Sequence, residues 1–257
     1  MKLIRIIPSL LLKDNNLFKG TNFDHHNYVG DVFNALKIFS EKKAHEIILL
    51  DIGARKNKKL IDLDLIKKIR QETFVPLCVG GGINDIDSAS RIINEGVEKT
   101  IVNASTLANL DLVNRVASKF GSQSSTVSVD VVKNDNKYLI YSHLLKKTIN
   151  LDMVKFIKNC ESAGAGEIIL TAVHREGTGL GYDIDLYKIA ENLVKIPIIA
   201  SGGGKDLNSM REVFDKTKLS AAAAGNNFVY YGSRKAVLIN YPDKETIVSL
   251  MEHYEDH

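Results

Sequence analysis

Two apolar stretches that end in glycines decide the fold: residues 74–83 read FVPLCVGGGI, and residues 196–204 read IPIIASGGG. Each stretch is short and apolar on both faces, which is typical of a buried parallel strand. Pro76 in the first stretch and Pro197 in the second lie 121 residues apart. This spacing is a first indication that one structural unit occurs twice along the chain.

Other landmarks repeat at the same spacing, and two of them open an EIIL run. The pairs are Glu46 and Glu167, Gly82 and Gly203, and Asn103 and Ala224. One spacing shared by several landmarks is hard to obtain by chance. It predicts two fused half-barrels of four strand–helix units each, at about residues 1–120 and 121–257.

Short apolar runs alternate with longer amphipathic runs along the whole chain. The predicted strands are residues 3–9, 46–52, 74–83, 99–105, 125–132, 167–173, 196–204 and 220–226. Amphipathic helical patterns lie between them, for example at 30–44, 60–72 and 85–96. Eight such units in one run favour an α/β fold, a single-domain (βα)8 TIM barrel, over an open doubly wound sheet.

The charge pattern and the apolar runs argue against nucleic-acid and membrane proteins. The 34 Lys and Arg residues and the 31 Asp and Glu residues are scattered, whereas a nucleic-acid binder usually has a dense basic stripe. No run is long enough to span a bilayer. Arg5 interrupts the first apolar run and no small-residue cleavage site follows it, which argues against a signal peptide. We expect a cytoplasmic protein that binds neither nucleic acid nor membrane.

The cysteines and histidines show no pattern of a metal site. We expect Cys78 and Cys160 to be reduced thiols, and no Cys/His spacing is typical of zinc. The adjacent His25 and His26 are expected in a polar loop. The sequence therefore predicts neither a metal nor another cofactor.

The glycine-ended strands indicate where a ligand binds. Ligands of barrels bind at the carboxyl ends of the strands, where glycines let a phosphate approach backbone N–H groups and a helix N-terminus. Each glycine run is followed, one strand later, by small residues, at Asn103–Ala104 and Ala224–Gly225. Two matching loops predict two phosphate sites that face each other. The alternative is that the glycines only make tight turns, which a single loop would favour.

A set of motifs carries a family resemblance over nearly the whole chain. In chain order they are RIIPSL, KDNNLFKGTNF, LLDI, VPLCVGGGI, VNAS, GAGEIILT, REGT, GYD and PIIASGGG. Together they resemble the cyclase subunit of imidazole glycerol phosphate synthase, a barrel of histidine biosynthesis. The resemblance implies a glutaminase subunit bound at the N-terminal barrel face as a heterodimer, with ammonia passing through the barrel. At the C-terminal face of the barrel, ammonia would then react with a bis-phosphorylated ribulosyl substrate, giving imidazole glycerol phosphate and an aminoimidazole carboxamide ribotide.

The resemblance implies two aspartates as acid and base, and this chain keeps one of them. Asp130 matches the family aspartate of the fifth strand, whereas Leu11 stands where the first strand should carry the other. Asp14 is no replacement, because the family has an aspartate there too. Loss of one positioned acid or base typically costs about 10²–10⁴-fold in rate.

The resemblance also implies residues that contact phosphate and substrate, and some of this face has changed. The matching positions are Lys19, Asp51, Gly82, Asn103, Thr171, Gly177, Ser201, Gly203, Ala224 and Gly225, with Asp183 also kept. Lys19 is expected in a flexible first loop, from which its ammonium could hold a phosphate. The departures are Ala104 for a threonine, Gly225 for a serine, and His174 and Glu176 for aspartates.

At the opposite end of the barrel the family pattern is complete. Arg5, Glu46, Lys99 and Glu167 match four charged residues that gate ammonia entry, and Glu98 matches an acid that contacts the glutaminase. A plain salt-bridge cluster that closes the barrel is the alternative interpretation, because buried charges must be paired.

Three hypotheses follow. The first is an authentic cyclase, a lyase that makes the histidine precursor. The second, which we favour, is a second-copy branch of the family that supplies ammonia to a sugar amidotransferase for amidination of a surface-polysaccharide sugar. Residues 28–39 and 230–242 resemble that branch. The third is a related barrel isomerase, which also needs the first-strand aspartate but no ammonia gate.

Overall fold

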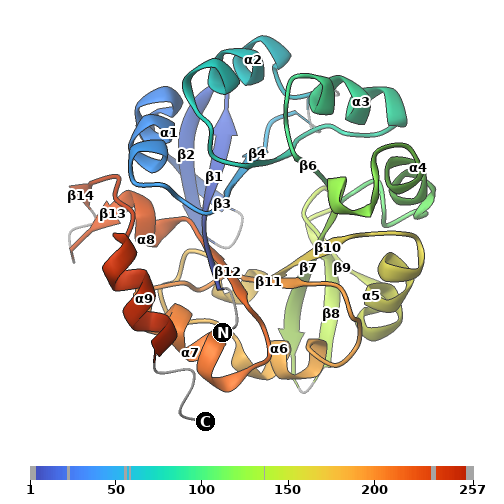
Figure 1. Cartoon of the computed structure of the whole chain (residues 1–257). Coiled ribbons are helices and arrows are strands. Elements are labelled where there is room, and N and C mark those ends of the chain that lie inside the picture. Colours follow the sequence, from blue (N-terminus) through green and yellow to red (C-terminus); the bar gives the residue numbers. More distant parts are fainter. Residues whose placement is uncertain are drawn as a thin grey trace.

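The computed structural model describes residues 4–21, 24–54, 57, 59–135, 137–232 and 236–252. Within these residues, eight parallel strands surround a central axis and helices cover them on the outside (Figure 1). Around the barrel they are β1 (Arg5–Lys13), β4 (Ile47–Asp51), β5 (Leu77–Gly80), β6 (Lys99–Val102), β7 (Ser125–Asn134), β10 (Glu167–Ala172), β11 (Ile198–Ser201) and β12 (Ala221–Ala224). Strand β12 pairs back onto β1, which closes the barrel and confirms the predicted (βα)8 fold.

The helices follow the strands in the order expected for this fold. They are α1 (Val32–Glu41), α2 (Leu63–Glu72), α3 (Ile86–Asn94), α4 (Asp111–Phe120), α5 (Met153–Ser162), α6 (Ile184–Ala190), α7 (Leu207–Lys216), α8 (Asn226–Val229) and α9 (Lys244–Glu252). Short 3₁₀ turns lie at η1 (Ser122–Ser124) and η2 (Val173–Arg175). Most helices bury one apolar stripe, as their sequence periodicity predicts.

Helix starts repeat at the 121-residue spacing. Three pairs of aspartates accept a hydrogen bond from the first turn of their helix, an N-cap typically worth about 1 kcal/mol. The pairs are Asp31 and Asp152, Asp62 and Asp183, and Asp85 and Asp206. The internal repeat therefore extends to how each helix begins, while the boundary between the halves near residue 120 stays a prediction.

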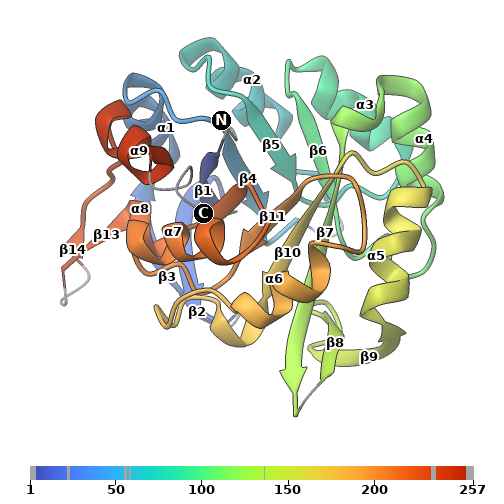
Figure 2. The same ribbon diagram turned by 60° about the horizontal axis from the view of Figure 1, so that its bottom comes forward.

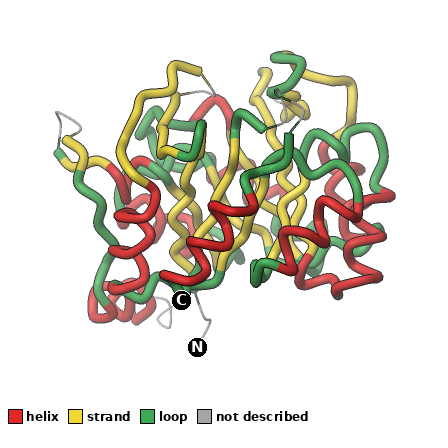
Figure 3. The backbone as a smooth tube through the Cα atoms, turned by 90° about the horizontal axis from the view of Figure 1, so that it is seen from above, coloured by secondary structure: helices red, strands yellow, loops and turns green. Residues whose placement is uncertain are grey.

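Two antiparallel hairpins project from the same end of the barrel (Figures 2 and 3). One consists of β2 (Asn16–Thr21) and β3 (Asp24–Asp31), and the other of β8 (Lys137–Ser142) and β9 (Lys147–Asp152). They follow the first and the fifth barrel strand. The expectation of a polar loop at His25 and His26 is wrong, because both belong to β3. The expected flexible first loop is also replaced by this hairpin, which pairs with β1.

Strand lengths differ from the predictions for local reasons. Strand β1 runs on to Lys13, beyond the predicted 3–9, because its last residues pair with both β4 and β2. Strand β5 is shorter than 74–83, because Gly81 and Gly82 adopt positive φ angles of 142° and 74° and leave the ladder.

The glycine turns are required by close backbone contacts. A Cβ on Gly82 would lie 1.9 Å from the carbonyl oxygen of Lys59, and one on Gly203 would lie 2.2 Å from that of Gly181. The two halves of the barrel thus use the same packing. Tight turning alone accounts for these two glycines, so phosphate binding at them stays a prediction.

The core has two layers. Between strands and helices lie the large side chains, Phe39, Tyr187, Phe214, Phe228 and Tyr241 among them. Inside the barrel lies a smaller cluster of Ile7, Ile48, Cys78, Ile101, Ile169, Ile199, Ala221 and Ala223. This inner cluster separates the two ends of the barrel axis.

The C-terminal segment ties back to the first strand. After α8 the chain forms a short hairpin of β13 (Tyr230–Tyr231) and β14 (Ala236–Val237), which leaves Tyr231 largely exposed. Tyr241 is buried, and its hydroxyl donates a hydrogen bond to the Ile6 carbonyl at 2.9 Å. The last part of the chain therefore stabilises the N-terminal end of β1.

Candidate functional site

Four charged side chains form a closed ring at the N-terminal mouth of the barrel. Arg5 donates hydrogen bonds to Glu46 at 2.8 Å and to Glu167. The Nζ of Lys99 lies 2.9 Å from Oε1 of Glu46 and 2.8 Å from Oε2 of Glu167. Each charge touches two of opposite sign, and both carboxylates are at most 5% exposed. The structure thus brings together the four residues of the predicted gate.

The ring keeps its own charges. Burial lowers the pKa of Lys99, but the hydrogen bonds and charges of Glu167 and Glu46 outweigh it, so the Lys99 pKa is raised. The same balance raises the pKa of Arg5. Both cations stay protonated, which matches two carboxylates in a site that could not hold an unpaired charge.

Beyond the ring the barrel interior is apolar. The Cys78 thiol is fully buried, its Sγ lies 3.7 Å from the Thr126 hydroxyl, and burial raises its pKa well above the usual range. The next inward side chains include Ile7, Ile48 and Ile169. An ion would lose its hydration here without a partner, at a far higher cost in free energy than a small neutral molecule.

A polar arc lines one half of the C-terminal mouth. Asn103, Asp130, Thr171 and Ser201 come from four consecutive barrel segments, and Thr171 is in register with both Asp130 and Ser201. The amide of Asn103 donates to Oδ2 of Asp130 at 2.8 Å. Asp130, Thr171 and Ser201 are all buried. These four predicted site residues are therefore brought together.

The other half of the mouth is apolar or lacks side chains. Leu11 is half-buried and in register with Leu50, and strand alternation from Ile7 places it on the inward face of β1. Gly80, at the end of β5, and Gly225, directly after β12, follow the same alternation. Asp130 therefore faces a side of the mouth whose inward strand positions carry no ionisable group.

Lys19 reaches this apolar side from β2. It is 6% exposed, and its Nζ lies 2.5 Å from Oε1 of Glu176. A Cβ on Gly225 would lie 2.5 Å from that Nζ. The glycine that departs from the family serine thus leaves room for the buried Lys19–Glu176 pair.

Comparison with known proteins now places the chain. Residues 5–235 match the family described as Histidine biosynthesis protein. A protein of Leptospira borgpetersenii, provisionally named imidazole glycerol phosphate synthase subunit HisF, is 41% identical over 248 residues, 95% of this chain and 98% of that protein. The chain belongs to the HisF-like family of imidazole glycerol phosphate synthase cyclase subunits.

Two further relatives show the range of names in the HisF-like family. A Pseudomonas aeruginosa protein, provisionally named subunit hisF2, is 40% identical over 240 residues, 93% of this chain and 96% of that protein. The Streptococcus mutans subunit HisF is 36% identical over 227 residues, 88% of this chain and 90% of that protein.

Three of the residues carried over from the HisF-like pattern are engaged in local structure. The Asp51 carboxylate accepts hydrogen bonds from the backbone N–H groups of Gly53 and Ala54 at 2.8 and 2.9 Å. Burial raises the pKa of Asp51, and these two bonds offset part of that effect. Asp183 caps α6, and the carbonyl of Gly177 accepts from Asn226 at 3.2 Å. Asp51, Asp183 and Gly177 therefore each accept hydrogen bonds from other residues of the barrel.

His174 stands where the HisF-like pattern has an aspartate, and its side chain connects two segments of the structure. Nε2 of His174 lies 2.9 Å from Oδ2 of Asp183, and its Nδ1 accepts from the backbone N–H of Lys133 at 3.3 Å. Tyr138 donates to the other oxygen of Asp183 at 2.9 Å. His174 therefore joins the β7–β8 extension to the start of α6.

Sequence reasoning missed His143. It lies in the turn after β8, with Nδ1 at 3.4 Å from Oδ2 of Asp130. No motif or spacing points to it, because the hairpin that carries it was itself not predicted.

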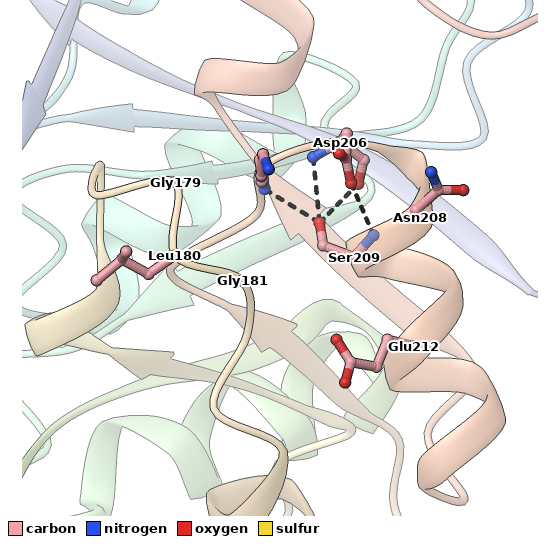
Figure 4. A pocket seen from close by; sticks show the side chains of 8 residues that line it. Gly179, Leu180, Gly181, Asp206, Asn208, Ser209 and Glu212 are labelled. Atoms are coloured by element: carbon pink, nitrogen blue, oxygen red, sulfur yellow. Dashed lines mark hydrogen bonds between the residues drawn. The ribbon is translucent and has the colours of Figure 1, made fainter.

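A surface pocket of about 410 Å³ lies beside the start of α7 (Figure 4). Its lining residues are Gly179, Leu180, Gly181, Lys205, Asp206, Asn208, Ser209 and Glu212. The side chains of Asp206 and Ser209 already satisfy the helix start as a capping box. None of the predicted site residues lines this pocket.

The described residues contain neither a metal cluster nor a membrane-spanning helix. Within them, no group of three or more His, Cys, Asp or Glu side chains could hold a metal ion. In the same part of the chain, no helix is long and apolar enough to cross a bilayer.

Proposed function

We propose that this protein is a HisF-like subunit that pairs with a glutaminase and passes ammonia through its barrel to an acceptor reaction, with little cyclase activity of its own. The acceptor reaction is amidination of a surface-polysaccharide sugar by a partner amidotransferase. The observation that supports this proposal is a difference between the two ends of the barrel. The ring of Arg5, Glu46, Lys99 and Glu167 is complete, whereas Leu11 leaves the inward strand positions on one side of the opposite mouth without an acid.

The barrel interior supports passage of a neutral molecule. A closed ring of paired charges stands at one end and an apolar lining follows it. Ammonia can cross such a lining because it carries no charge, while ammonium would lose its hydration. A salt-bridge cluster with no gating role would need no such lining beyond it.

Two features support the second-copy branch. The Pseudomonas aeruginosa relative carries the suffix 2 in its name and matches nearly the whole chain. The segment 230–242 resembles that branch in sequence. In this chain it forms the exposed β13–β14 hairpin and anchors Tyr241.

Two phosphate sites at the C-terminal mouth are part of the proposal. One lies at Gly82 and Asn103, the other at Gly203, Ala224 and Gly225. Among the described residues, three buried side-chain atoms have no hydrogen-bond partner: Ser105 Oγ, Ser125 Oγ and Asn226 Oδ1. The first and the last of them also lie 121 residues apart. Such polar atoms favour a polar ligand at equivalent places in both halves.

The second candidate function is an authentic cyclase. Asp130 with its Asn103 partner and the buried Lys19 favour it. Turnover of the bis-phosphorylated ribulosyl substrate by the purified protein, with excess ammonium and no partner, separates the two. We expect a rate at least about 10²-fold below that of a HisF enzyme from histidine biosynthesis, since one acid is missing. An equal rate would establish the cyclase instead.

Removing a cation of the ring is expected to uncouple ammonia transfer. In Lys99→Ala or Arg5→Ala the remaining charges no longer alternate, so the entrance loses its closed geometry. The measurement is the ratio of glutamine-driven to ammonium-driven product formation in the complex with the glutaminase. Arg115→Ala, which removes an exposed ion pair with Asp111 in the first part of α4, is the matched control. If both ring variants couple like wild type, the gate assignment is wrong.

Phe74 is expected to be a major contact of the glutaminase. It is 89% exposed, in the loop before β5, beside Arg70 and Glu98 at the N-terminal face. A large exposed aromatic at a protein interface often contributes about 2 kcal/mol, so Phe74→Ala should weaken binding roughly 30-fold. Titration calorimetry measures the change. Leu180→Ala, an exposed apolar residue at the opposite end, should leave affinity unchanged, and equal affinities for all three proteins would exclude this face.

A further inference from the structure

His143 is placed beside the carboxylate that the mouth retains. Its Nδ1 lies 3.4 Å from Oδ2 of Asp130, the same oxygen that accepts from Asn103 at 2.8 Å. The imidazole is 41% exposed and the carboxylate 5% exposed. The pair therefore joins a buried anion to a side chain that reaches the open side of the mouth.

The position of His143 is determined by a braced hairpin. Strand β8 pairs with β7 from Val131 opposite Ile140 to Asn134 opposite Lys137. The hydroxyl of the buried Ser142 accepts from the backbone N–H of Leu145 at 3.2 Å, which holds the turn. The backbone of the turn is therefore held in place, and it carries His143 next to Asp130.

A carboxylate beside one ring nitrogen selects the tautomer of a histidine. When Nδ1 carries the proton, Nε2 carries the lone pair that can accept a proton. The positive imidazolium that results is stabilised by the same carboxylate. Such contacts are often long without substrate and shorten when the reacting groups are bound.

We infer that His143, next to Asp130, is a second proton-transfer group of this mouth on the Asp130 side, while the side of Leu11 stays without an acid on its strand. The inference rests on the proposed function in one respect, that ammonia emerges here. The step concerns attack of ammonia on the ketone carbon of the ribulosyl substrate, because amidination of an acetamido group belongs to the partner amidotransferase.

The nitrogen lone pair of ammonia forms a C–N bond, and the π pair of the carbonyl moves to its oxygen. One N–H proton passes to Nε2 of His143, which gives imidazolium beside Asp130. The proton then returns to the oxygen, which leaves as water after a second proton has moved from nitrogen, and a C=N bond remains.

The first experiment measures the tautomer of His143 next to Asp130 and needs no enzyme activity. We expect the nitrogen NMR shifts of His143 in the full-length protein to show the Nδ1–H tautomer, and Asp130→Ala to return it to the Nε2–H form that free histidine prefers. Asp183→Ala, which removes the partner of His174, is the matched control and should leave His143 unchanged. An Nε2–H tautomer in the wild-type protein would overturn the inference.

The second experiment tests proton transfer, with ammonium as the nitrogen source and the ribulosyl substrate, in the Leu11→Asp background. His143→Ala should lower turnover about 10²-fold, and free imidazole should restore part of it, which a structural role would not allow. His143→Asn keeps a donor near Asp130 but cannot transfer a proton, so it should be as slow. Leu144→Ala, the exposed neighbour in the turn, should keep full turnover.

The outcomes separate this inference from the proposed function. Full turnover in His143→Ala, or a loss that imidazole does not restore, would overturn the role of His143. No turnover at all in the Leu11→Asp background would also overturn it. In either case the coupling ratio of the ring variants still tests ammonia passage independently.

Discussion

Leu11→Asp is expected to raise ammonium-dependent turnover of the bis-phosphorylated ribulosyl substrate by about 10²–10⁴-fold. Leu11 stands on the inward face of β1 and is half-buried, across the mouth from Asp130. A carboxylate there would restore an ionisable group on each side of the bound substrate. The barrel frame, the Asn103–Asp130 bond and the buried Lys19 are already in place.

Leu11→Asn is the matched control for this change. It has the shape and polarity of aspartate but cannot transfer a proton at neutral pH. Both variants lose the apolar contact with Leu50, so any difference in their rates comes from proton transfer. Steady-state rates at saturating ammonium give the comparison. If Leu11→Asp were no faster than Leu11→Asn, the first-strand position would have no part in the chemistry of this protein.

Glu167→Gln is expected to destabilise the fold by about 3 kcal/mol or more, because removing one partner from a buried ion pair leaves uncompensated charge. Glu167 is 5% exposed on its side chain and contacts both Arg5 and Lys99. Without it, both cations share Glu46 alone. For a chain of this size, the melting temperature should fall by about 6–12 °C.

The control for the ring is Glu98→Gln. This carboxylate is 41% exposed and lies 3.2 Å from Arg70, so its loss should cost less than about 1 kcal/mol. The double variant Lys99→Gln with Glu167→Gln removes one charge of each sign and should be less destabilised than the sum of the single variants. The free energy of unfolding is measured by heat and by denaturant for Glu98→Gln, Lys99→Gln, Glu167→Gln and the double variant, each against the wild-type protein. Additive losses in the double variant would contradict a ring stabilised by alternating charge.

Much of the site could be expected from sequence because its positions follow strand periodicity. The four ring residues lie at or directly before the first position of their strands, on the inward face: Arg5, Glu46, Lys99 and Glu167. Closure of the barrel then makes them neighbours. The same argument puts Leu11 and Asp130 at the opposite mouth. Family resemblance suggested these residues, and the alternation of side chains along a strand explains why they meet.

Loop residues followed no such periodicity. Asp51 stays predicted at the substrate, and its carboxylate also accepts from the backbone of its own turn, which its sequence position did not indicate. Lys19 was expected in a flexible loop and instead pairs with Glu176, which is 157 positions away in the chain. Neither outcome is encoded in a local pattern, since each depends on how a loop folds against the finished barrel.

The sequence by itself determined the barrel, its 121-residue repeat and the two ends of the axis. These features rest on short-range physics: alternation along strands, helical periodicity and glycines where strands end. Only the tertiary structure decided that the first and fifth strands continue into hairpins, that Gly225 makes room for Lys19, and that His143 meets Asp130. Such contacts form between segments that become neighbours only when the barrel closes, so no local pattern along the chain specifies them.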